Sequence, residues 1–299
     1  MIKKLEGIFP ALLTPFTADN KIDEAALRRA VEHNIVQDVS GFYVCGSTGE
    51  AFLLTPEERK RVLEIVADQT KERVSIIAHI GAISTDLTLD LGRHAVSVKG
   101  VTALSSIPPF YYGFTRKEII KYYSDIATEL AFPLIPYNFP KLLGVTLTPE
   151  IVAELRKNKN IVGIKFTSQN FYDLERIKLS DAGLVVFNGF DEMFLAGLSM
   201  GADGAIGSTF NFMADKFIAI KKEFAANNIA KARTLQTEAN TVIQILLTAS
   251  DFMAAEKYAM DIIGIPYGVP RRPFMPLTDD EKQFFNEKLP SLLHPYCNG

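Results

Sequence analysis

The chain has 299 residues, of which 47% are hydrophobic and 22% charged, and its formal net charge at pH 7 is −3. This composition is typical of a globular protein and excludes a disordered or low-complexity chain. Because the net charge is slightly negative and the chain has no long basic run, we expect its partner to be a small molecule rather than nucleic acid or a membrane surface.

Short apolar runs typical of buried strands alternate along the chain with segments of helical pattern. Two of the predicted helices begin with capping boxes, at Thr55 and at Thr115. Eight strands alternating with helices predict an α/β fold, a (β/α)₈ TIM barrel, rather than a doubly wound sheet, because no dinucleotide fingerprint follows the first strand. The predicted strands are residues 8–13, 42–45, 74–80, 101–104, 132–137, 161–167, 184–188 and 204–207.

The end of the chain carries more helical pattern than one closing helix requires. Residues 216–226, 230–247 and 251–263 are predicted to be successive helices. We therefore expect a single domain in which residues 1–226 form the barrel and residues 227–299 form a C-terminal helical extension packed on it.

A lysine interrupts one of the apolar predicted strands, residues 161–167. Burial disfavours the ammonium form and lowers a lysine pKa by up to about 3 to 5 units. A lysine that is neutral near pH 7 is a nucleophile that forms Schiff bases with ketones. Lys165 is thus a candidate for covalent catalysis, and the alternative is a lysine that reaches solvent or pairs with a carboxylate.

Polar residues follow the carboxyl ends of the predicted strands, where the active site of such a barrel lies. The segment 46–50, Gly-Ser-Thr-Gly-Glu, offers backbone N–H groups and two hydroxyls that suit a carboxylate or a phosphate. A plain glycine turn is the alternative, and the lack of a Walker lysine argues against a nucleotide. Tyr137 ends the fifth strand and is a candidate proton-transfer group, with packing as the alternative role.

The histidines and cysteines indicate neither a metal site nor a disulfide framework. The four histidines form no HxH or HExxH set, so we expect no metal and no metal-dependent aldolase. Cys45 and Cys297 form no CxxC, and Cys45 is expected to be a buried small hydrophobe. Because the sequence also lacks an apolar leader and a run of about 18 apolar residues, we expect a reduced, cytoplasmic protein with no membrane span.

Four motifs occur in order, at residues 46–50, 137–140, 163–165 and 201–208. They resemble those of the N-acetylneuraminate lyase and dihydrodipicolinate synthase superfamily, and the resemblance extends over nearly the whole length. The resemblance implies Schiff-base chemistry on pyruvate without a cofactor, with Lys165 as the nucleophile and Tyr137 as the proton-transfer group. It also implies that Ser47 and Thr48 hold the pyruvate carboxylate. Tyr111 resembles a tyrosine that joins Ser47 and Tyr137 in catalysis by reaching into a neighbouring subunit's site, which implies a homotetramer.

The resemblance favours the lyase branch of this superfamily. Leu142 stands where the synthase branch carries an arginine, and Phe-Thr-Ser follows Lys165 where that branch has Glu-Ala-Thr. The implied reaction is reversible cleavage of N-acetylneuraminate to pyruvate and N-acetylmannosamine. The residues that resemble the sugar-binding positions are Thr167, Gly189, Asp191, Glu192 and Ser208.

Three alternatives stay open from the sequence. A 2-keto-3-deoxy sugar acid aldolase would use the same lysine and tyrosine, and a dihydrodipicolinate synthase would share the barrel. A ligand-binding regulatory barrel without turnover is the alternative from another class, because a fold alone does not establish a function. For Asp191 and Glu192, the alternative is a pair of acids in the first turn of a helix, where they favour the helix dipole.

Overall fold

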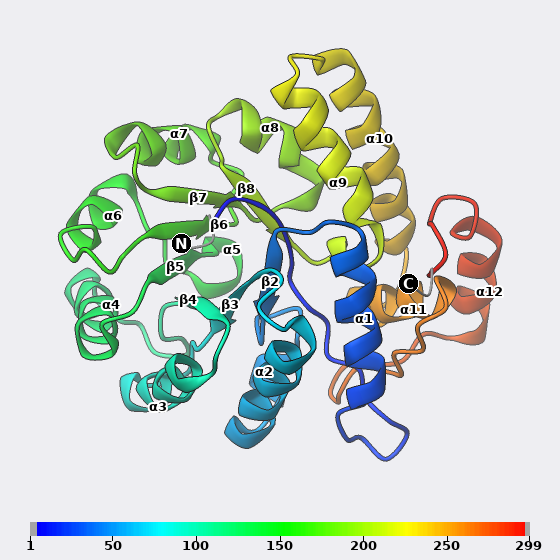
Figure 1. Ribbon diagram of the computed structural model, residues 1–299, viewed down its shortest axis with the longest axis horizontal. Coiled ribbons are helices and arrows are strands. Elements are labelled where there is room, and N and C mark those ends of the chain that lie inside the picture. Colours follow the sequence, from blue (N-terminus) through cyan, green and yellow to red (C-terminus); the bar gives the residue numbers. More distant parts are fainter. Residues whose placement is uncertain (1–4, 297–299) are drawn as a thin grey trace.

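The computed structural model describes residues 5–296, in which eight parallel strands are surrounded by helices (Figure 1). The order of the strands in the sheet is β1-β8-β7-β6-β5-β4-β3-β2, and a bridge between Ala11 and Tyr43 joins the first strand to the second. The sheet closes on itself, which confirms the predicted (β/α)₈ barrel. The strands are β1 (Gly7–Pro10), β2 (Gly41–Val44), β3 (Ser75–His79), β4 (Val101–Ser106), β5 (Leu134–Asn138), β6 (Gly163–Phe166), β7 (Val185–Asn188) and β8 (Gly204–Gly207).

The helices between the strands form the outer ring of the barrel (Figure 1). Both predicted capping boxes are present, with the hydroxyls of Thr55 and Thr115 accepting from the third residue of each helix. The connecting helices are α1 (Glu24–Val36), α2 (Pro56–Thr70), α3 (Thr85–Ser97), α4 (Arg116–Leu130), α5 (Pro140–Leu143), α6 (Pro149–Leu155), α7 (Phe171–Ser180) and α8 (Phe194–Ser199), with short 3₁₀ turns η1 (Ala51–Leu53) and η2 (Asp191–Met193).

Apolar side chains form two cores, one between strands and helices and one inside the barrel. Successive side chains of a strand point to opposite faces of the sheet, so a strand such as β2 contributes Phe42 to the outer core and Tyr43 to the inner one. Tyr43 and Tyr137 belong to the inner core, and the amine of Lys165 lies over both of their rings. Lys165 therefore points into the barrel, which is a packed core and not a pore.

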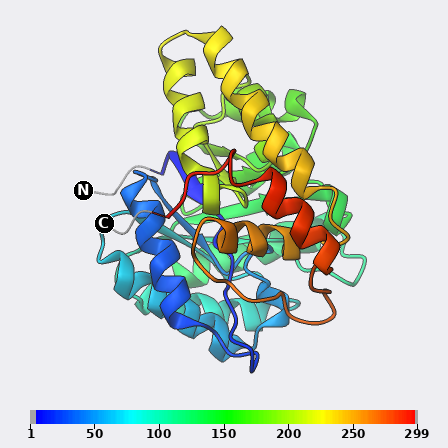
Figure 2. The same cartoon turned by 90° about the vertical axis from the view of Figure 1, so that its right-hand side faces the viewer.

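The chain continues beyond the barrel in α9 (Phe210–Ala225), α10 (Ile229–Leu246), α11 (Phe252–Ile262) and α12 (Asp279–Lys288). Helix α10 runs alongside α9, and α11 and α12 follow on the same side of the molecule (Figures 1 and 2). The predicted boundary after residue 226 falls in the turn between α9 and α10. The division into barrel and extension stays a prediction.

Two features of this end of the chain differ from the sequence prediction. Helix α9 begins at Phe210 rather than at residue 216, with a kink at Met213; its start gives no capping signal because the Thr209 side chain bonds Asp191 instead. Helix α12 was not predicted, since Phe285 is its only buried residue. The capping box of Thr278 and Glu281 is the signal that marks its start. No helix within residues 5–296 is long and apolar enough to cross a membrane.

Candidate active site

A cavity of about 390 Å³ lies at the carboxyl ends of the strands. It gathers side chains from β5 and β6 and from the loops that follow β2, β7 and β8. The barrel thus brings together Ser47 and Ser208, which are 161 positions apart in the sequence. The predicted site residues that line the cavity are Ser47, Thr48, Tyr137, Lys165, Thr167, Gly189, Asp191, Glu192 and Ser208.

Lys165 lies on β6 inside the barrel, and only 5% of its surface is exposed. Its Nζ is 4.1 Å from the centre of the Tyr137 ring and 4.4 Å from the centre of the Tyr43 ring. Burial lowers the pKa of Lys165 to about 7, while the carboxylate of Asp191 acts in the opposite direction. A large fraction of this amine is neutral at physiological pH, which is the form that attacks a carbonyl carbon.

Tyr137 lies on β5 as the register partner of Lys165 on β6. Burial raises the pKa of its phenol to about 12, and the hydroxyls of Thr167 and Ser47 beside it act in the opposite direction. Although Thr167 lies near the phenol, its buried Oγ1 has no hydrogen bond of good geometry within residues 5–296. The phenol is therefore protonated at physiological pH, with two hydroxyl groups beside it.

The turn after β2 holds Ser47 and Thr48 at the cavity wall. The N–H of Gly49 donates to the carbonyl of Gly46 at 3.1 Å, and the Thr14 hydroxyl donates to the carbonyl of Gly49 at 2.8 Å. These bonds fix the backbone on either side of the two hydroxyl residues. The Ser47 and Thr48 side chains face the cavity, where they suit a carboxylate ligand.

A buried ion pair holds this turn in place. The Glu50 carboxylate is 2.6 Å from the ammonium of Lys257 on α11, with both side chains fully buried, and it accepts the backbone N–H of Arg271 at 2.7 Å. Because breaking a buried pair leaves an uncompensated charge, this contact ties the C-terminal helices to the turn.

Asp191 is buried at the cavity wall and has a structural partner that the sequence did not predict. Its Oδ2 accepts from the N–H of Thr209 at 2.8 Å and from the Thr209 hydroxyl at 2.6 Å. Burial raises the pKa of Asp191 to about 6, against the effect of Thr209. A Cβ at Gly207 would collide with this carboxylate. One carboxylate oxygen of Asp191 is thus already hydrogen-bonded to Thr209 at the start of α9.

The other residues that resemble sugar-binding positions differ in their exposure to solvent. Glu192 is exposed, whereas Gly189 and Ser208 are half-buried. A Cβ at Gly189 would collide with the Thr167 hydroxyl, so glycine at this position lets the loop after β7 approach β6 closely.

Tyr111 and Leu142 do not line the cavity of their own chain. Tyr111 is 84% exposed and has a positive φ of 81°, and its ring packs edge-on against Tyr112 at 5.0 Å. Leu142 is 63% exposed on α5. The Leu142 side chain therefore points to solvent and does not line the cavity of its own chain.

Other reactive side chains have structural partners. His79 Nδ1 is 2.9 Å from the Cys45 carbonyl, and its Nε2 accepts the N–H of Ile107, so the ring is neutral with its proton on Nδ1. Burial also raises the pKa of Cys45 to about 11, which suits the expected packing role. Cys297 lies outside the described residues. Within residues 5–296, no three or more His, Cys, Asp or Glu side chains are grouped to hold a metal ion.

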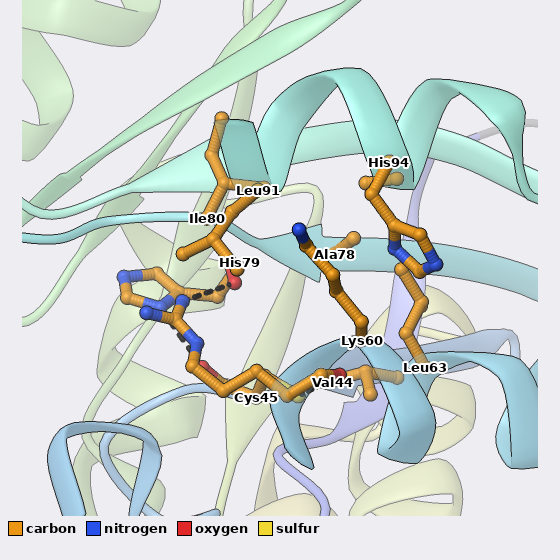
Figure 3. Close-up of a pocket in the computed structure, with 11 residues that line it drawn as sticks. Val44, Cys45, Lys60, Leu63, Ala78, His79, Ile80, Leu91 and His94 are labelled. Atoms are coloured by element: carbon orange, nitrogen blue, oxygen red, sulfur yellow. Dashed lines mark hydrogen bonds between the residues drawn. The ribbon is translucent and has the colours of Figure 1, made fainter. Parts of the chain in front are cut away.

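Cys45 and His79 also line a second, much smaller cavity between β2, β3, α2 and α3 (Figure 3). Its volume is about 10 Å³, close to the minimum for one water molecule. The guanidinium of Arg59 donates to the His79 and Gly81 carbonyls at its edge. This space is a packing gap behind the strands and not a binding site.

The C-terminal helices contribute residues that the sequence interpretation missed. Helix α10 holds the loop after β7, because Gln236 donates to the Asp191 carbonyl and Asn240 to the Glu192 carbonyl, both at 3.1 Å. The helical spacing of apolar residues in the sequence predicts these helices, but it does not show that one side of them faces the cavity. The lining residues from this C-terminal part are Ile243, Leu247, Phe252, Met253, Glu256 and Phe274, and the loops after β5 and β7 add Phe139 and Phe190.

Comparisons with known proteins agree with this geometry. Residues 4–291 match the model of the dihydrodipicolinate synthetase family. The chain is 45% identical over 291 residues to an N-acetylneuraminate lyase of Rhizobium meliloti (strain 1021), covering 97% of this chain and 96% of the relative. Its fold is similar to that of CdNal from Clostridium difficile in complex with mannosamine, with a TM-score of 0.92, 36% identity, and coverage of 95% and 98%.

A second solved structure is also similar. It is the catalytic lysine mutant of the sialic acid aldolase of Ruminococcus gnavus, with a TM-score of 0.92, 30% identity, and coverage of 95% of each chain. Such coverage means that these similarities include both the barrel and the C-terminal helices.

Proposed function

Because this chain belongs to the dihydrodipicolinate synthetase family, we propose that it is a class I aldolase that cleaves N-acetylneuraminate reversibly to pyruvate and N-acetylmannosamine. The nearly full-length similarity to an N-acetylneuraminate lyase and to a sialic acid aldolase supports this activity. The observation that carries the mechanism is the buried Lys165 amine at the cavity floor, with a pKa lowered to about 7.

In the proposed mechanism, the neutral amine of Lys165 attacks the C2 ketone of the open-chain substrate, and loss of water gives an imine. Protonation of the imine creates an electron sink beside the C3–C4 bond. The C4 hydroxyl loses its proton, its electron pair forms the aldehyde, and the electrons of the C3–C4 bond move into the iminium. The resulting enamine is protonated at C3, and hydrolysis frees pyruvate and Lys165.

Tyr137 is the group that takes the C4 hydroxyl proton in this proposal. Its phenol is protonated before the imine forms, because burial raises its pKa to about 12. The phenol gives its proton to the imine nitrogen, and the positive iminium beside the ring stabilises the resulting phenolate, which then takes the C4 hydroxyl proton. Proton transfer is thereby coupled to imine formation and does not occur in the unliganded protein.

Residues at the two ends of the cavity are assigned to binding of the substrate. Ser47 and Thr48 are assigned to the substrate carboxylate, next to Tyr137. Thr167, Gly189, Asp191, Glu192 and Ser208 are assigned to the hydroxyl-bearing chain. The position of Thr167 supports this assignment, because its buried hydroxyl lies beside the Tyr137 phenol at the cavity wall, within reach of a polar ligand.

A homotetramer in which Tyr111 reaches the site of a neighbouring subunit is part of the same proposal. The 84% exposure of Tyr111 in the single chain supports it, because an aromatic side chain so exposed gains from a partner surface. Sedimentation should give four chains per particle, and a monomeric particle with full activity would contradict this arrangement. The cytoplasmic location stays a prediction from the sequence.

The activity is tested by a substrate panel with pyruvate detection. N-acetylneuraminate should release one pyruvate and one N-acetylmannosamine per turnover. A ligand-binding regulatory barrel would bind substrate without releasing pyruvate, so the panel also separates the enzyme from the non-enzyme alternative.

A further inference from the structure

Helix α11 places an acidic side chain against the active-site cavity. Phe252, Met253 and Glu256 all line this cavity, and because the first two lie four and three residues before Glu256, all three share one face of the helix. Unlike the strand-end residues, this group comes from the C-terminal helices. Glu256 is the acid of the group, and only 1% of its surface is exposed.

Glu256 has no ion-pair partner among the described residues. Its Oε1 is buried without a hydrogen bond within residues 5–296. The adjacent Lys257 pairs instead with Glu50 at 2.6 Å. The polar neighbours of the Glu256 carboxyl are the Ser208 hydroxyl and the Asp191 carboxyl, which are both assigned to the sugar end of the site.

The surroundings keep this acid in its neutral form. Burial raises the pKa of Glu256 to about 8, the Asp191 carboxyl acts in the same direction, and the Ser208 hydroxyl acts against it. A protonated carboxyl has one O–H donor and a free acceptor oxygen, so it can donate a hydrogen bond to a hydroxyl group or accept one from it. The terminal torsion of glutamate is soft, and rotation presents either oxygen to the cavity.

An unpaired buried polar atom is costly in the empty protein, and the cost disappears when a ligand supplies the missing partner. We propose that Glu256 is a specificity-determining residue whose carboxyl group forms a hydrogen bond with a hydroxyl of the substrate's sugar chain, next to Ser208. This inference rests on the proposed function and deepens it, because it adds an acid from α11 to the residues that recognise the aldehyde half.

A purely structural role would have a different signature from direct binding. If Glu256 only supported the fold of the cavity, its loss would impair pyruvate and sugar binding together. Direct hydrogen bonding to the sugar predicts that only the sugar half is affected. The two substrates of the reverse reaction, pyruvate and N-acetylmannosamine, separate these cases.

The experiment compares Glu256→Leu and Glu256→Gln with the unmodified protein. Glu256→Leu should raise the KM for N-acetylmannosamine by about 10 to 100 fold, because a site built to bond a hydroxyl loses that discrimination with its polar group. The KM for pyruvate and the yield of borohydride-trapped pyruvate imine should stay unchanged. Glu256→Gln keeps a neutral donor and acceptor and should stay within about threefold of the unmodified protein for both substrates.

The outcomes distinguish this inference from the proposed function. An unchanged KM for N-acetylmannosamine in Glu256→Leu, or a parallel rise in both KM values, would overturn the role of Glu256 while leaving the aldolase activity in place. If Glu256→Gln were as impaired as Glu256→Leu, recognition by a neutral acid would be wrong. If the unmodified protein released no pyruvate from N-acetylneuraminate but still formed the borohydride-trapped pyruvate imine, the proposed substrate would be wrong. The proposed role of Glu256 would then be wrong as well.

Discussion

The side chains of Lys165 and Tyr137 meet inside the barrel, where Nζ lies 4.1 Å from the centre of the phenol ring. An aromatic face favours the ammonium form by about 2 kcal/mol when the pair is desolvated. A lysine pKa lowered from 10.5 to about 7 corresponds to roughly 5 kcal/mol in the other direction. Burial therefore dominates, and the amine is available as a nucleophile.

The first prediction is that Lys165 forms the imine. Borohydride added with pyruvate should attach one pyruvate-derived group to Lys165, measured by mass spectrometry of peptides. Lys257 is the internal control, because it is also buried with its pKa lowered to about 8 but pairs with Glu50. Labelling of Lys257, or activity that survives Lys165→Ala, would contradict the mechanism.

The second prediction concerns proton transfer by Tyr137. Tyr137→Phe should keep imine trapping but lower kcat by about 10² to 10⁴ fold, the usual contribution of a general acid-base group. Tyr43→Phe is the matched control, since the Tyr43 ring also contacts Lys165 but its hydroxyl donates to Ser105 at 3.0 Å. Equal losses in the two variants would assign the effect to packing around the amine rather than to the phenol.

The sequence predicted the barrel well because its signals are local. Apolar runs and capping boxes such as that of Thr55 depend on neighbouring residues, and eight strand–helix units have one common closed arrangement. The same topology places strand-end residues together, so Lys165 and Tyr137 were found without knowing any contact. Helix α12 has a weak apolar pattern with Phe285 alone buried, which explains why it was missed.

The parts of the site that depend on long-range packing could not be predicted in this way. Glu256 lies on a helix that follows the barrel, and no local pattern tells which surface that helix covers. The bond from Thr209 to Asp191 joins two loops 18 residues apart, so its carboxylate appeared to be wholly available to substrate. Leu142 aligned with a functional position of the superfamily, yet its side chain is exposed.

The third prediction is a pH dependence of imine formation. Only the neutral amine attacks the ketone, so the rate should rise about tenfold per pH unit below the lowered pKa of about 7 and level off above it. Asp191→Asn removes a carboxylate that raises the pKa of Lys165, and the midpoint should move to lower pH. Trapping rates measured between about pH 5 and pH 9 test this, and a flat profile would exclude Lys165 as the titrating nucleophile.

The fourth prediction is independence from metal ions. The iminium supplies the electron sink that a metal would otherwise provide, and the histidines have no ligand spacing in the sequence. Activity should be the same with and without EDTA after extensive dialysis. Loss of activity with chelator and recovery with a divalent ion would replace the Schiff-base mechanism by a metal-dependent one.

The fifth prediction concerns the aldehyde end of the substrate. A pocket that bonds substrate hydroxyls rejects analogues that lack them by up to about 10⁴ fold, because its own polar groups stay unpaired. N-acetylneuraminate should therefore have a higher kcat/KM than 2-keto-3-deoxygluconate, which has a shorter hydroxyl-bearing chain. Aspartate semialdehyde with pyruvate should give negligible product, because Leu142 replaces the arginine that the synthase branch uses for its second carboxylate.

Variants of Glu192 and Asp191 test which side chains bind the hydroxyl groups of the substrate's sugar chain. Glu192→Ala should raise the KM for N-acetylneuraminate and leave pyruvate imine formation intact, since the Glu192 side chain is exposed at the cavity rim. Asp191→Ala should act more broadly, because it also releases Thr209 at the start of α9 and removes the carboxylate that influences Lys165. Kinetics on both sugar acids measure the difference. If 2-keto-3-deoxygluconate proved the better substrate, the sugar acid aldolase alternative would replace the proposed one, with Lys165 and Tyr137 keeping their roles.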